Sequence, residues 1–144
     1  WGFISYTGPG VLLRCPQVYN SEAYLNTLER AAIHVINEFN KIFMQDNAPL
    51  HKSRLSMNWF DDHKIVVLDW PARSPDLNVI ENLWGKIKHN LNTKPNKPSN
   101  LDQLEQRVME EWAEINESDC KSLYESIPNR LKSVIKSRIA ITKY

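Results

Sequence analysis

Residues 41–49 read KIFMQDNAP, and this stretch determines the architecture that the sequence predicts. Its centre is a short apolar run, typical of a buried strand, and the run ends at Asp46-Asn47. Pro49 lies near the start of a predicted helix that continues to about Asp62, because proline is tolerated in the first turn of a helix. A second buried strand is predicted at residues 64–68, KIVVL. The alternation of strands and helices indicates an α/β layer structure with a mixed sheet.

Upstream of this stretch, the sequence predicts a hairpin and a helix. Two apolar runs at residues 1–6 and 11–15 flank the turn sequence TGPG at residues 7–10. Asn20 or Ser21 is suited to cap the helix, since short polar side chains accept hydrogen bonds from the first backbone N–H groups. The apolar positions of that helix recur every three or four residues, at Tyr24, Leu28, Ala31, Val35 and Phe39.

Downstream, helices are predicted to follow one another. Ser74 is expected to cap a helix that has Pro75 at its first position and runs to about Leu91. Residues 92–100 form a predicted loop, at the end of which Ser99 and Asp102 make a start similar to a capping box. The apolar stripe of the helix that follows is Leu101, Leu104, Val108, Trp112 and Ile115. Two short helices close the chain, and the last directs its apolar residues inward: Leu131, Val134, Ile135 and Ile139.

Composition limits the classes of protein to which the chain can belong. A hydrophobic content of 42% over 144 residues fits one globular domain. The sequence has no apolar run of about 18 residues, so we expect no membrane span. The segment shows no signal peptide, and its start at Trp1 suggests a piece of a longer protein. Cys15 and Cys120 are too few for a disulfide framework, so we expect reduced thiols in an intracellular protein.

Charge is unevenly distributed towards the C-terminus, although the net charge is only +1. Residues 102–119 hold seven acids and one base, whereas residues 121–144 hold six bases and one acid. Two interpretations stay open: a solvated helix followed by a basic tail, or a tail that contacts phosphate.

Two acids occupy positions suited to metal binding. Asp46 follows the C-terminal end of a predicted strand, and Glu81 lies in the second turn of a predicted helix whose lead-in contains two prolines. Mg²⁺ is a hard cation that binds one or two carboxylates together with waters and phosphate oxygens. The alternatives are structural, because Asp at a strand end is often a helix cap and Glu near a helix start interacts with the helix dipole.

Two longer blocks surround these acids: QDNAPLHKS at residues 45–53 and WPARSPDLNVIENLW at residues 70–84. Both resemble the signature blocks of the Tc/mariner superfamily of DDE transposases, and the 34 residues between Asp46 and Glu81 match the spacing of that family. The resemblance covers essentially the whole chain. It implies a ribonuclease H-like fold, a mixed sheet flanked by helices, truncated at its N-terminus. The implied core is at about residues 1–91, with a C-terminal helical extension at about residues 99–144.

The resemblance also implies an activity. Asp46 and Glu81 match the second and third catalytic acids of the family, which would bind two Mg²⁺ (or Mn²⁺) ions in the complete enzyme. The implied reaction is DNA strand cleavage at transposon ends followed by strand transfer into target DNA, in the nucleus and without a small-molecule cofactor. A homodimer is a further expectation. Carboxylates and metal ions suit this chemistry, because in-line phosphoryl transfer requires positioning and charge neutralisation.

Further residues in or near these blocks are candidates for supporting roles. Asn47 stabilises the turn after Asp46 or orients its carboxylate. His51 contacts a DNA phosphate or a metal-bound water, unless it is simply an imidazole on a helix surface. Asn78 shapes the metal pocket or satisfies buried backbone groups. The candidates for phosphate contacts are Arg73, Lys86 and Lys88.

The chain departs from the family pattern in one respect that bears on activity. Family members require a first Asp on the opening strand, and residues 1–45 contain no Asp. We therefore expect this segment alone not to cut DNA, because neighbouring carboxylates would face each other with too little positive charge. The alternative is an inactive, decayed or domesticated transposase-derived domain that acts in DNA or protein binding. A missing opening strand would also leave the backbone of residues 42–44 without partners.

Overall fold

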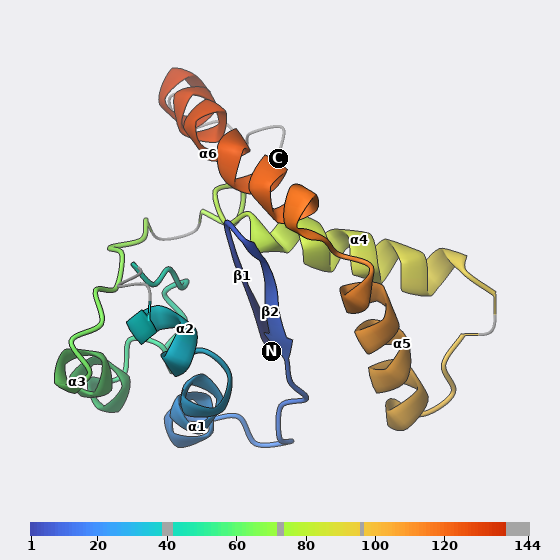
Figure 1. The fold of residues 1–144 in the computed structure, drawn as a ribbon, viewed down its shortest axis with the longest axis horizontal. Helices are drawn as coiled ribbons and strands as arrows, with labels where there is room; N and C mark the ends of the chain where they lie inside the picture. The colour runs from blue at the N-terminus through green and yellow to red at the C-terminus, as the bar shows by residue number, and fades with distance from the viewer. Residues whose placement is uncertain (39–41, 72–73, 96, 138–144) are drawn as a thin grey trace. The chain divides into compact units, whose positions relative to one another are not determined.

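The computed structural model describes residues 1–38, 42–71, 74–95 and 97–137, and the chain divides into two compact units (Figure 1). Unit 1 comprises Trp1–Gly2 and Val11–Ser74, and unit 2 comprises Phe3–Gly10 and Pro75–Tyr144. The predicted division into a core at about residues 1–91 and helices at about residues 99–144 stays a prediction. None of the helices in the described ranges combines the length and the apolar content that crossing a membrane requires.

The predicted N-terminal hairpin is present, with its turn displaced. β1 (Gly2–Ser5) and β2 (Gly8–Leu12) form a two-stranded sheet, and the turn consists of Tyr6 and Thr7 rather than of residues 7–10. The position follows from Gly8, whose φ of 132° lies in a region that residues with a Cβ rarely adopt. The hairpin prediction is confirmed, and the position of its turn is corrected.

The helix predicted after the hairpin begins where the sequence indicates and is then interrupted. α1 (Ser21–Ala31) is capped by Asn20, whose side chain accepts a hydrogen bond of 3.0 Å from a backbone N–H of the first turn. The helix breaks at Ala32 and continues as α2 (Ile33–Glu38). Neither glycine nor proline marks the break, so the sequence pattern could not predict it. Phe39, the last predicted apolar position, lies outside the described residues.

α3 (Arg54–Asp62) begins later than predicted. Its N-cap is Ser53, whose hydroxyl accepts a hydrogen bond of 3.1 Å from a backbone N–H of the first helical turn. Residues 49–51 form a turn ahead of the helix, so Pro49 precedes it instead of lying in its first turn. A serine cap provides a hydrogen-bond acceptor that proline lacks, and this accounts for the later start.

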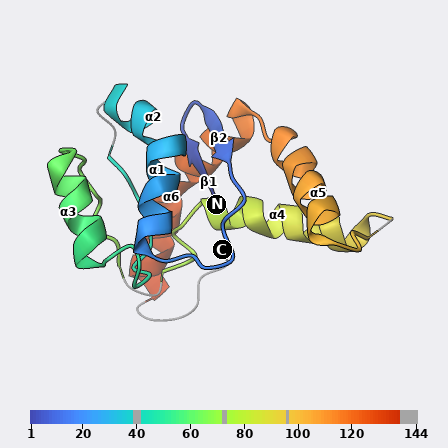
Figure 2. The same ribbon diagram turned by 90° about the horizontal axis from the view of Figure 1, so that it is seen from below.

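The core of unit 1 lies between α1 and α3, which pack side by side (Figure 2). Tyr24 and Leu28 of α1 and Phe60 of α3 are each at most 1% exposed. The ring of Phe60 also packs against Phe43, with ring centroids 5.5 Å apart. This contact attaches the segment that precedes Asp46 to the helical core.

The two strands predicted around α3 are reduced to one parallel bridge, between Phe43 and Val67. The Phe43 N–H donates to the Val66 carbonyl, and the Phe43 carbonyl accepts from the Leu68 N–H, each at 2.8 Å. The two segments are therefore parallel neighbours, as a mixed sheet requires. The expected lack of backbone partners at residues 42–44 is wrong for Phe43.

The prediction that both segments are buried strands is wrong in part. Ile65 is 7% exposed, whereas Ile42 and Val66 are 64% and 61% exposed. Alternate residues of an extended segment point to opposite faces. Phe60 covers the face that carries Phe43, and the neighbouring side chains on the other face remain in solvent.

α4 (Ile80–Thr93), in unit 2, also begins later than predicted. Its N-cap is Val79, which provides no side-chain hydrogen bond, so Ser74 does not cap the helix. Pro75 lies in a turn instead of at the first helical position, and its carbonyl accepts a hydrogen bond of 3.1 Å from the N–H three residues later. Glu81 consequently lies in the first turn of α4 and not in the second.

α5 (Leu101–Ala113) starts with a reciprocal cap, although not between the predicted Ser99 and Asp102. The Asn100 side chain accepts from the Gln103 N–H, and the Gln103 side chain accepts from the Ser99 N–H, both at 2.9 Å. The logic of a capping box is therefore present one residue further along the chain.

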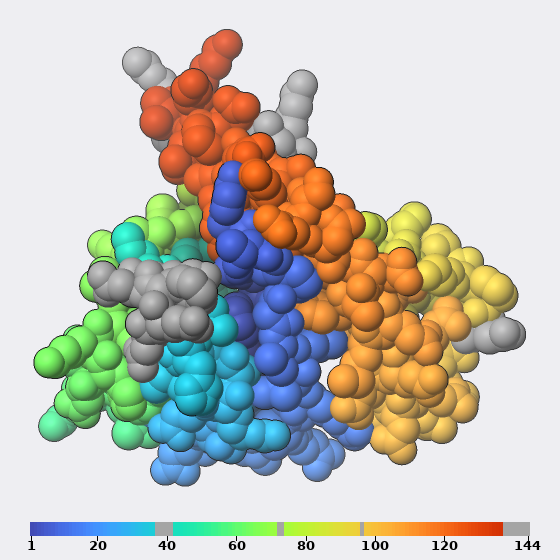
Figure 3. Space-filling model, in the orientation of Figure 1, coloured from blue at the N-terminus to red at the C-terminus, as the bar shows by residue number. Residues whose placement is uncertain are grey.

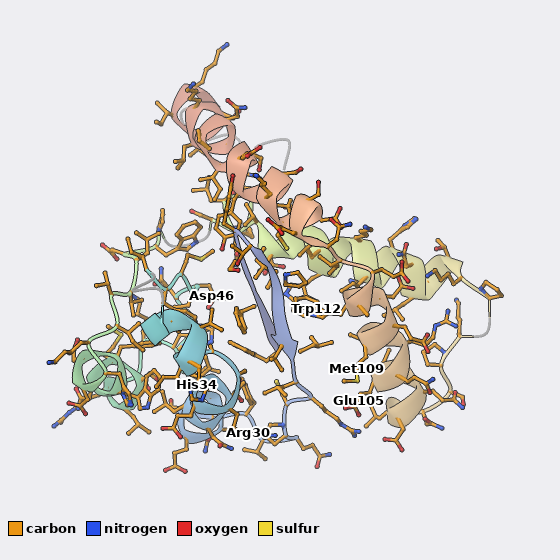
Figure 4. The ribbon with its side chains drawn as sticks, viewed as in Figure 1. Arg30, His34, Asp46, Glu105, Met109 and Trp112 are labelled. Atoms are coloured by element: carbon orange, nitrogen blue, oxygen red, sulfur yellow. The ribbon has the colours of Figure 1, made fainter. Side chains whose placement is uncertain are left out.

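The apolar stripe predicted for α5 is buried only towards its C-terminal end. Trp112 is 6% exposed and stacks on Trp84 of α4, with ring centroids 5.1 Å apart. Its indole N–H donates to the Gly10 carbonyl at 2.9 Å. Figure 4 shows Trp112 near the C-terminal end of α5, with Met109 and Glu105 on preceding turns. The start of the stripe, Leu101 and Leu104, is 66% and 37% exposed.

α6 (Glu117–Ser137) is one helix where the sequence predicts two short ones, and Pro128 lies inside it. The inward orientation predicted for its last apolar residues is wrong for Leu131 and Ile135, which are 44% and 76% exposed. Ile139 lies outside the described residues. The residue that α6 buries in this region is instead Arg130, which is 3% exposed.

The tip of the hairpin packs against the first half of α6 within unit 2 (Figure 3). The Tyr124 hydroxyl donates to the Ile4 carbonyl at 3.1 Å, and the Tyr124 ring meets that of Tyr6 edge to face, with centroids 6.2 Å apart. The Tyr6 hydroxyl donates to Glu125, also at 3.1 Å. These contacts join residues far apart in the sequence, so sequence periodicity cannot predict them.

Candidate metal centre

Asp46 is held by one of its two carboxylate oxygens. It follows Gln45, the last residue of the segment that bridges to Val67, and its side chain is 59% exposed. Oδ1 accepts a hydrogen bond from the Ala48 N–H at 3.0 Å, which is the geometry of an Asx-turn. The carboxylate therefore has a defined orientation and remains open to solvent.

His51 lies against the same oxygen. Its Nδ1 is 2.6 Å from Asp46 Oδ1, and the imidazole is 17% exposed. Because an ionised carboxylate only accepts hydrogen bonds, the imidazole donates through Nδ1. Of the interpretations open for His51, a free helix-surface imidazole is wrong, because the ring is directed at Asp46 from a turn before α3.

Asn47 connects the turn after Asp46 to a distant segment of unit 1. Its Nδ2 donates to the Trp70 carbonyl at 2.7 Å. This contact ties the first signature block to the start of the second one. The hydrogen bond explains why an amide is suited to the position, and whether Asn47 also stabilises the turn or orients the Asp46 carboxylate stays a prediction.

Glu81, in unit 2, is exposed in the first turn of α4, and its lead-in is held by an arginine from α6. Arg130 donates through Nη1 to the Asp76 carbonyl at 2.8 Å and through Nε to Ser126 Oγ at 2.7 Å. In the sequence, Arg130 is one base of the predicted basic tail. No local pattern signals its burial, because its partner lies 54 residues earlier in the chain.

The other residues predicted for the site are Asn78, Lys86, Lys88 and Arg73. Asn78 Oδ1 is buried and makes no hydrogen bond to any residue that the structure describes, so it satisfies no backbone group among them. Lys86 and Lys88 are exposed on α4, and Arg73 lies outside the described residues. Their phosphate contacts stay predictions.

The convergence of Asp46 and Glu81 also stays a prediction, because Asp46 belongs to unit 1 and Glu81 to unit 2. Among the described residues, no three His, Cys, Asp or Glu side chains gather closely enough to hold a metal ion. Any ion bound at Asp46 would therefore need oxygens from water or from a phosphate to complete its coordination, as is usual for Mg²⁺.

A comparison with known protein families identifies the family to which the chain belongs. Residues 1–105 match the family model described as DDE superfamily endonuclease. The chain belongs to this family. Both Asp46 and Glu81 lie within the matched range, and so do both signature blocks.

Relatives within the DDE superfamily are transposases. The chain is 36% identical over 122 residues to the transposable element Tc3 transposase of Caenorhabditis elegans, a match that covers 83% of this chain and 37% of that protein. The resemblance to the Tc/mariner superfamily is thus confirmed. The chain spans less than half of the length of the Tc3 protein.

Solved structures of a second DDE relative share the fold. The Mos1 transposase catalytic domain, solved with raltegravir and Mg, matches with a TM-score of 0.80 at 22% identity, over 99% of this chain and 75% of that one. The Mos1 transposase paired-end complex with the left transposon end also matches with a TM-score of 0.80, at 21% identity, over 99% of this chain and 43% of that one. The predicted ribonuclease H-like fold is confirmed.

Proposed function

We propose that this chain is the C-terminal part of a Tc/mariner-type transposase catalytic domain that cleaves and joins DNA with Mg²⁺ or Mn²⁺. The observation that carries the proposal is the state of Asp46. Its carboxylate is 59% exposed and is fixed at Oδ1 by the Ala48 N–H and by His51, inside the range that matches the DDE family. If Asp46 were only a helix cap, its Oδ1 would accept hydrogen bonds from backbone N–H groups at the start of a helix. No imidazole would be needed beside it.

The donor chemistry of the chain fits a hard divalent cation. Asp46 and Glu81 offer exposed carboxylate oxygens, which Mg²⁺ and Mn²⁺ prefer. In the complete enzyme these two acids would hold two ions, with a further Asp that residues 1–45 do not contain. Bound ions would neutralise charge on the phosphodiester and activate the attacking oxygen.

The residues of this chain would act by position and charge. Asp46 would present its second oxygen, Oδ2, while Oδ1 stays engaged with His51. Glu81 would add a second negative charge from the first turn of α4, held in place by the lead-in that Arg130 fixes. The exposed Lys86 and Lys88 on α4, and Arg73, would contact DNA phosphates without reading the base sequence.

DNA is the proposed partner, both as transposon ends and as target. The Mos1 transposase has been solved in a paired-end complex with a transposon end, and this chain shares its fold. We extend that assembly to a homodimer in the nucleus for the complete protein. Because contacts to phosphates are electrostatic, the affinity of the 144-residue chain for DNA should fall steeply as salt rises.

Metal binding by the 144-residue chain tests the proposal. We expect calorimetry to show weak, saturable binding of Mn²⁺ that is about 10-fold or more weaker in Asp46→Ala and in Glu81→Ala, since a ligand matters at least as much as the groups that orient it. Matched controls are Asp62→Ala and Glu117→Ala, which remove exposed acids at a helix end and in a first helical turn. Unchanged binding in both test variants would reject the metal site.

A second measurement tests whether Asp46 and Glu81 bind the same metal ion. Mn²⁺ broadens NMR signals of nuclei close to it, so one shared site should broaden the amides of both Asp46 and Glu81 at low occupancy. Broadening confined to one of the two residues would contradict a shared site, even if calorimetry detects binding.

A cleavage assay tests a further prediction, which is that the chain alone shows no activity. The 144-residue chain should not nick supercoiled plasmid with Mg²⁺ or Mn²⁺, because it supplies two of the three acids. Nicking that disappears in Asp46→Ala would overturn this expectation.

A second candidate function is that of a catalytically inactive, decayed or domesticated transposase-derived domain that binds DNA or protein. The sequence encoded immediately before Trp1 separates the two. A strand with an Asp, preceded by helix-turn-helix segments, supports the enzyme.

A further inference from the structure

Two buried polar side chains lie directly beneath the exposed carboxylate of Asp46. Tyr24, from α1, is 1% exposed, and Gln45, the residue before Asp46, is 7% exposed. Buried polar groups are costly unless they are hydrogen-bonded, so a pair at this place requires an explanation. Both residues contact His51, which in turn contacts Asp46.

The direction of the hydrogen bonds is set by Tyr24. Burial raises the pKa of the Tyr24 phenol above its ordinary value, and the proximity of Tyr19 and of the Asp46 carboxylate raises that pKa further. The phenol therefore keeps its proton and donates it to Gln45 Oε1. Gln45 is then left with its amide nitrogen as a donor, and Nε2 donates to the His51 carbonyl at 3.4 Å.

Tyr24 also holds the ring of His51. The two ring centroids are 4.4 Å apart with an interplanar angle of 42°, so the phenol covers one face of the imidazole. His51 is thus held at its backbone by Gln45 and at its ring by Tyr24. With both points fixed, Nδ1 faces Asp46 Oδ1 at 2.6 Å.

These contacts distinguish the two oxygens of Asp46. Oδ1 accepts from the Ala48 N–H and from His51, whereas no hydrogen bond reaches Oδ2 from the described part of the chain. We propose that Tyr24 is a positioning residue for Asp46, acting through Gln45 and His51, so that Oδ2 is the oxygen left open to a divalent cation. The proposal deepens the proposed function and rests on it for the identity of the cation.

A purely structural role for Tyr24 needs only its ring, which packs in the core between α1 and α3 whether or not the hydroxyl is present. The positioning role needs the hydroxyl, because only the hydroxyl orients the Gln45 amide. Tyr24→Phe separates the two, since it keeps the ring and removes the donor. Tyr124→Phe is the matched control, because it deletes a hydroxyl that donates to a backbone carbonyl in unit 2.

The first readout is NMR on the metal-free 144-residue chain with ¹⁵N-labelled histidine. In the wild type, the nitrogen shifts of His51 should report a proton on Nδ1. Tyr24→Phe should move these shifts towards a mixture of tautomers and should also shift the Asp46 side-chain carbon, whereas Tyr124→Phe should leave both unchanged. Signals of His51 and Asp46 that do not respond to Tyr24→Phe would overturn the proposal.

The second readout is Mn²⁺ affinity, which we expect Tyr24→Phe to weaken about 3- to 10-fold. This is below the roughly 10- to 100-fold loss for groups that bond a metal ligand directly, because Tyr24 acts through Gln45 and His51. His51→Asn, which can keep a donor near the place of Nδ1, should bind Mn²⁺ better than His51→Ala. Equal affinities in the wild type and Tyr24→Phe would also overturn the proposal. If the wild type binds no Mn²⁺, the metal function fails, and the metal-free NMR result still decides whether Tyr24 positions Asp46.

Discussion

Phe60→Ala is expected to lower the free energy of unfolding of unit 1 by about 3–5 kcal/mol, the range for removing a buried aromatic ring from a core. Phe60 is 1% exposed, and its ring contacts both Phe43 and Trp59, with centroids 5.5 and 5.2 Å away. The alanine would leave a cavity beneath the parallel bridge. We therefore expect the segment that ends at Asp46 to lose order before the helices do.

Chemical denaturation and amide hydrogen exchange measure this effect. The Phe43 and Leu68 amides, which form the bridge, should lose protection in Phe60→Ala. Leu55→Ala is the control on the same helix, because Leu55 is 47% exposed and its truncation should change stability by about 0.5 kcal/mol or less. Similar losses in the two variants would show that the ring of Phe60 is not the anchor of the bridge.

Arg130→Met is expected to destabilise unit 2 by about 2–4 kcal/mol, because it removes hydrogen bonds from a buried charged donor to partly buried acceptors. One of these acceptors is the Asp76 carbonyl, in the lead-in to α4. Methionine keeps much of the volume, so lost packing contributes little. The lead-in should become mobile, and with it the first turn of α4, which carries Glu81.

Amide hydrogen exchange measures whether Arg130→Met loosens the segment that leads into α4. The Glu81 amide donates to the Asn78 carbonyl, so its protection reports directly on the lead-in. Lys132→Met is the control, since it removes a base that is exposed on the same helix. If Arg130→Met leaves the Glu81 amide protected, the arginine stabilises α6 alone and has no role in placing Glu81.

The sequence predicted best the features that depend on local pattern. The hairpin, the Asn20 cap and the existence of α3, α4 and α5 follow from turn residues, caps and apolar periodicity. The family resemblance rested on two blocks around Asp46 and Glu81, and the family match covers both.

Helix starts were the least predictable feature, because several residues compete to begin a helix. Pro49 and Pro75 each favour a start, yet α3 begins after Ser53 and α4 after Val79. Proline fixes one backbone angle, which suits a turn as well as a helix. In both cases the proline stands in a turn, and the helix begins further along the chain.

Contacts between distant residues could not be predicted from periodicity. Arg130 belongs to the predicted basic tail, yet it is buried, and a carbonyl 54 residues earlier accepts its hydrogen bond. Tyr24 belongs to the predicted apolar stripe of the first helix, and its ring is buried. Its hydroxyl, however, reaches Gln45, a partner that a helical pattern does not reveal.

The stacking of Trp84 on Trp112 has an optical consequence. Two indoles with centroids 5.1 Å apart and nearly parallel planes, at 26°, share their electronic excitation. Such a pair gives a paired positive and negative band in circular dichroism, which vanishes once the rings separate. The chain thus carries a built-in spectroscopic signal for the association of α4 with α5, readable without any label.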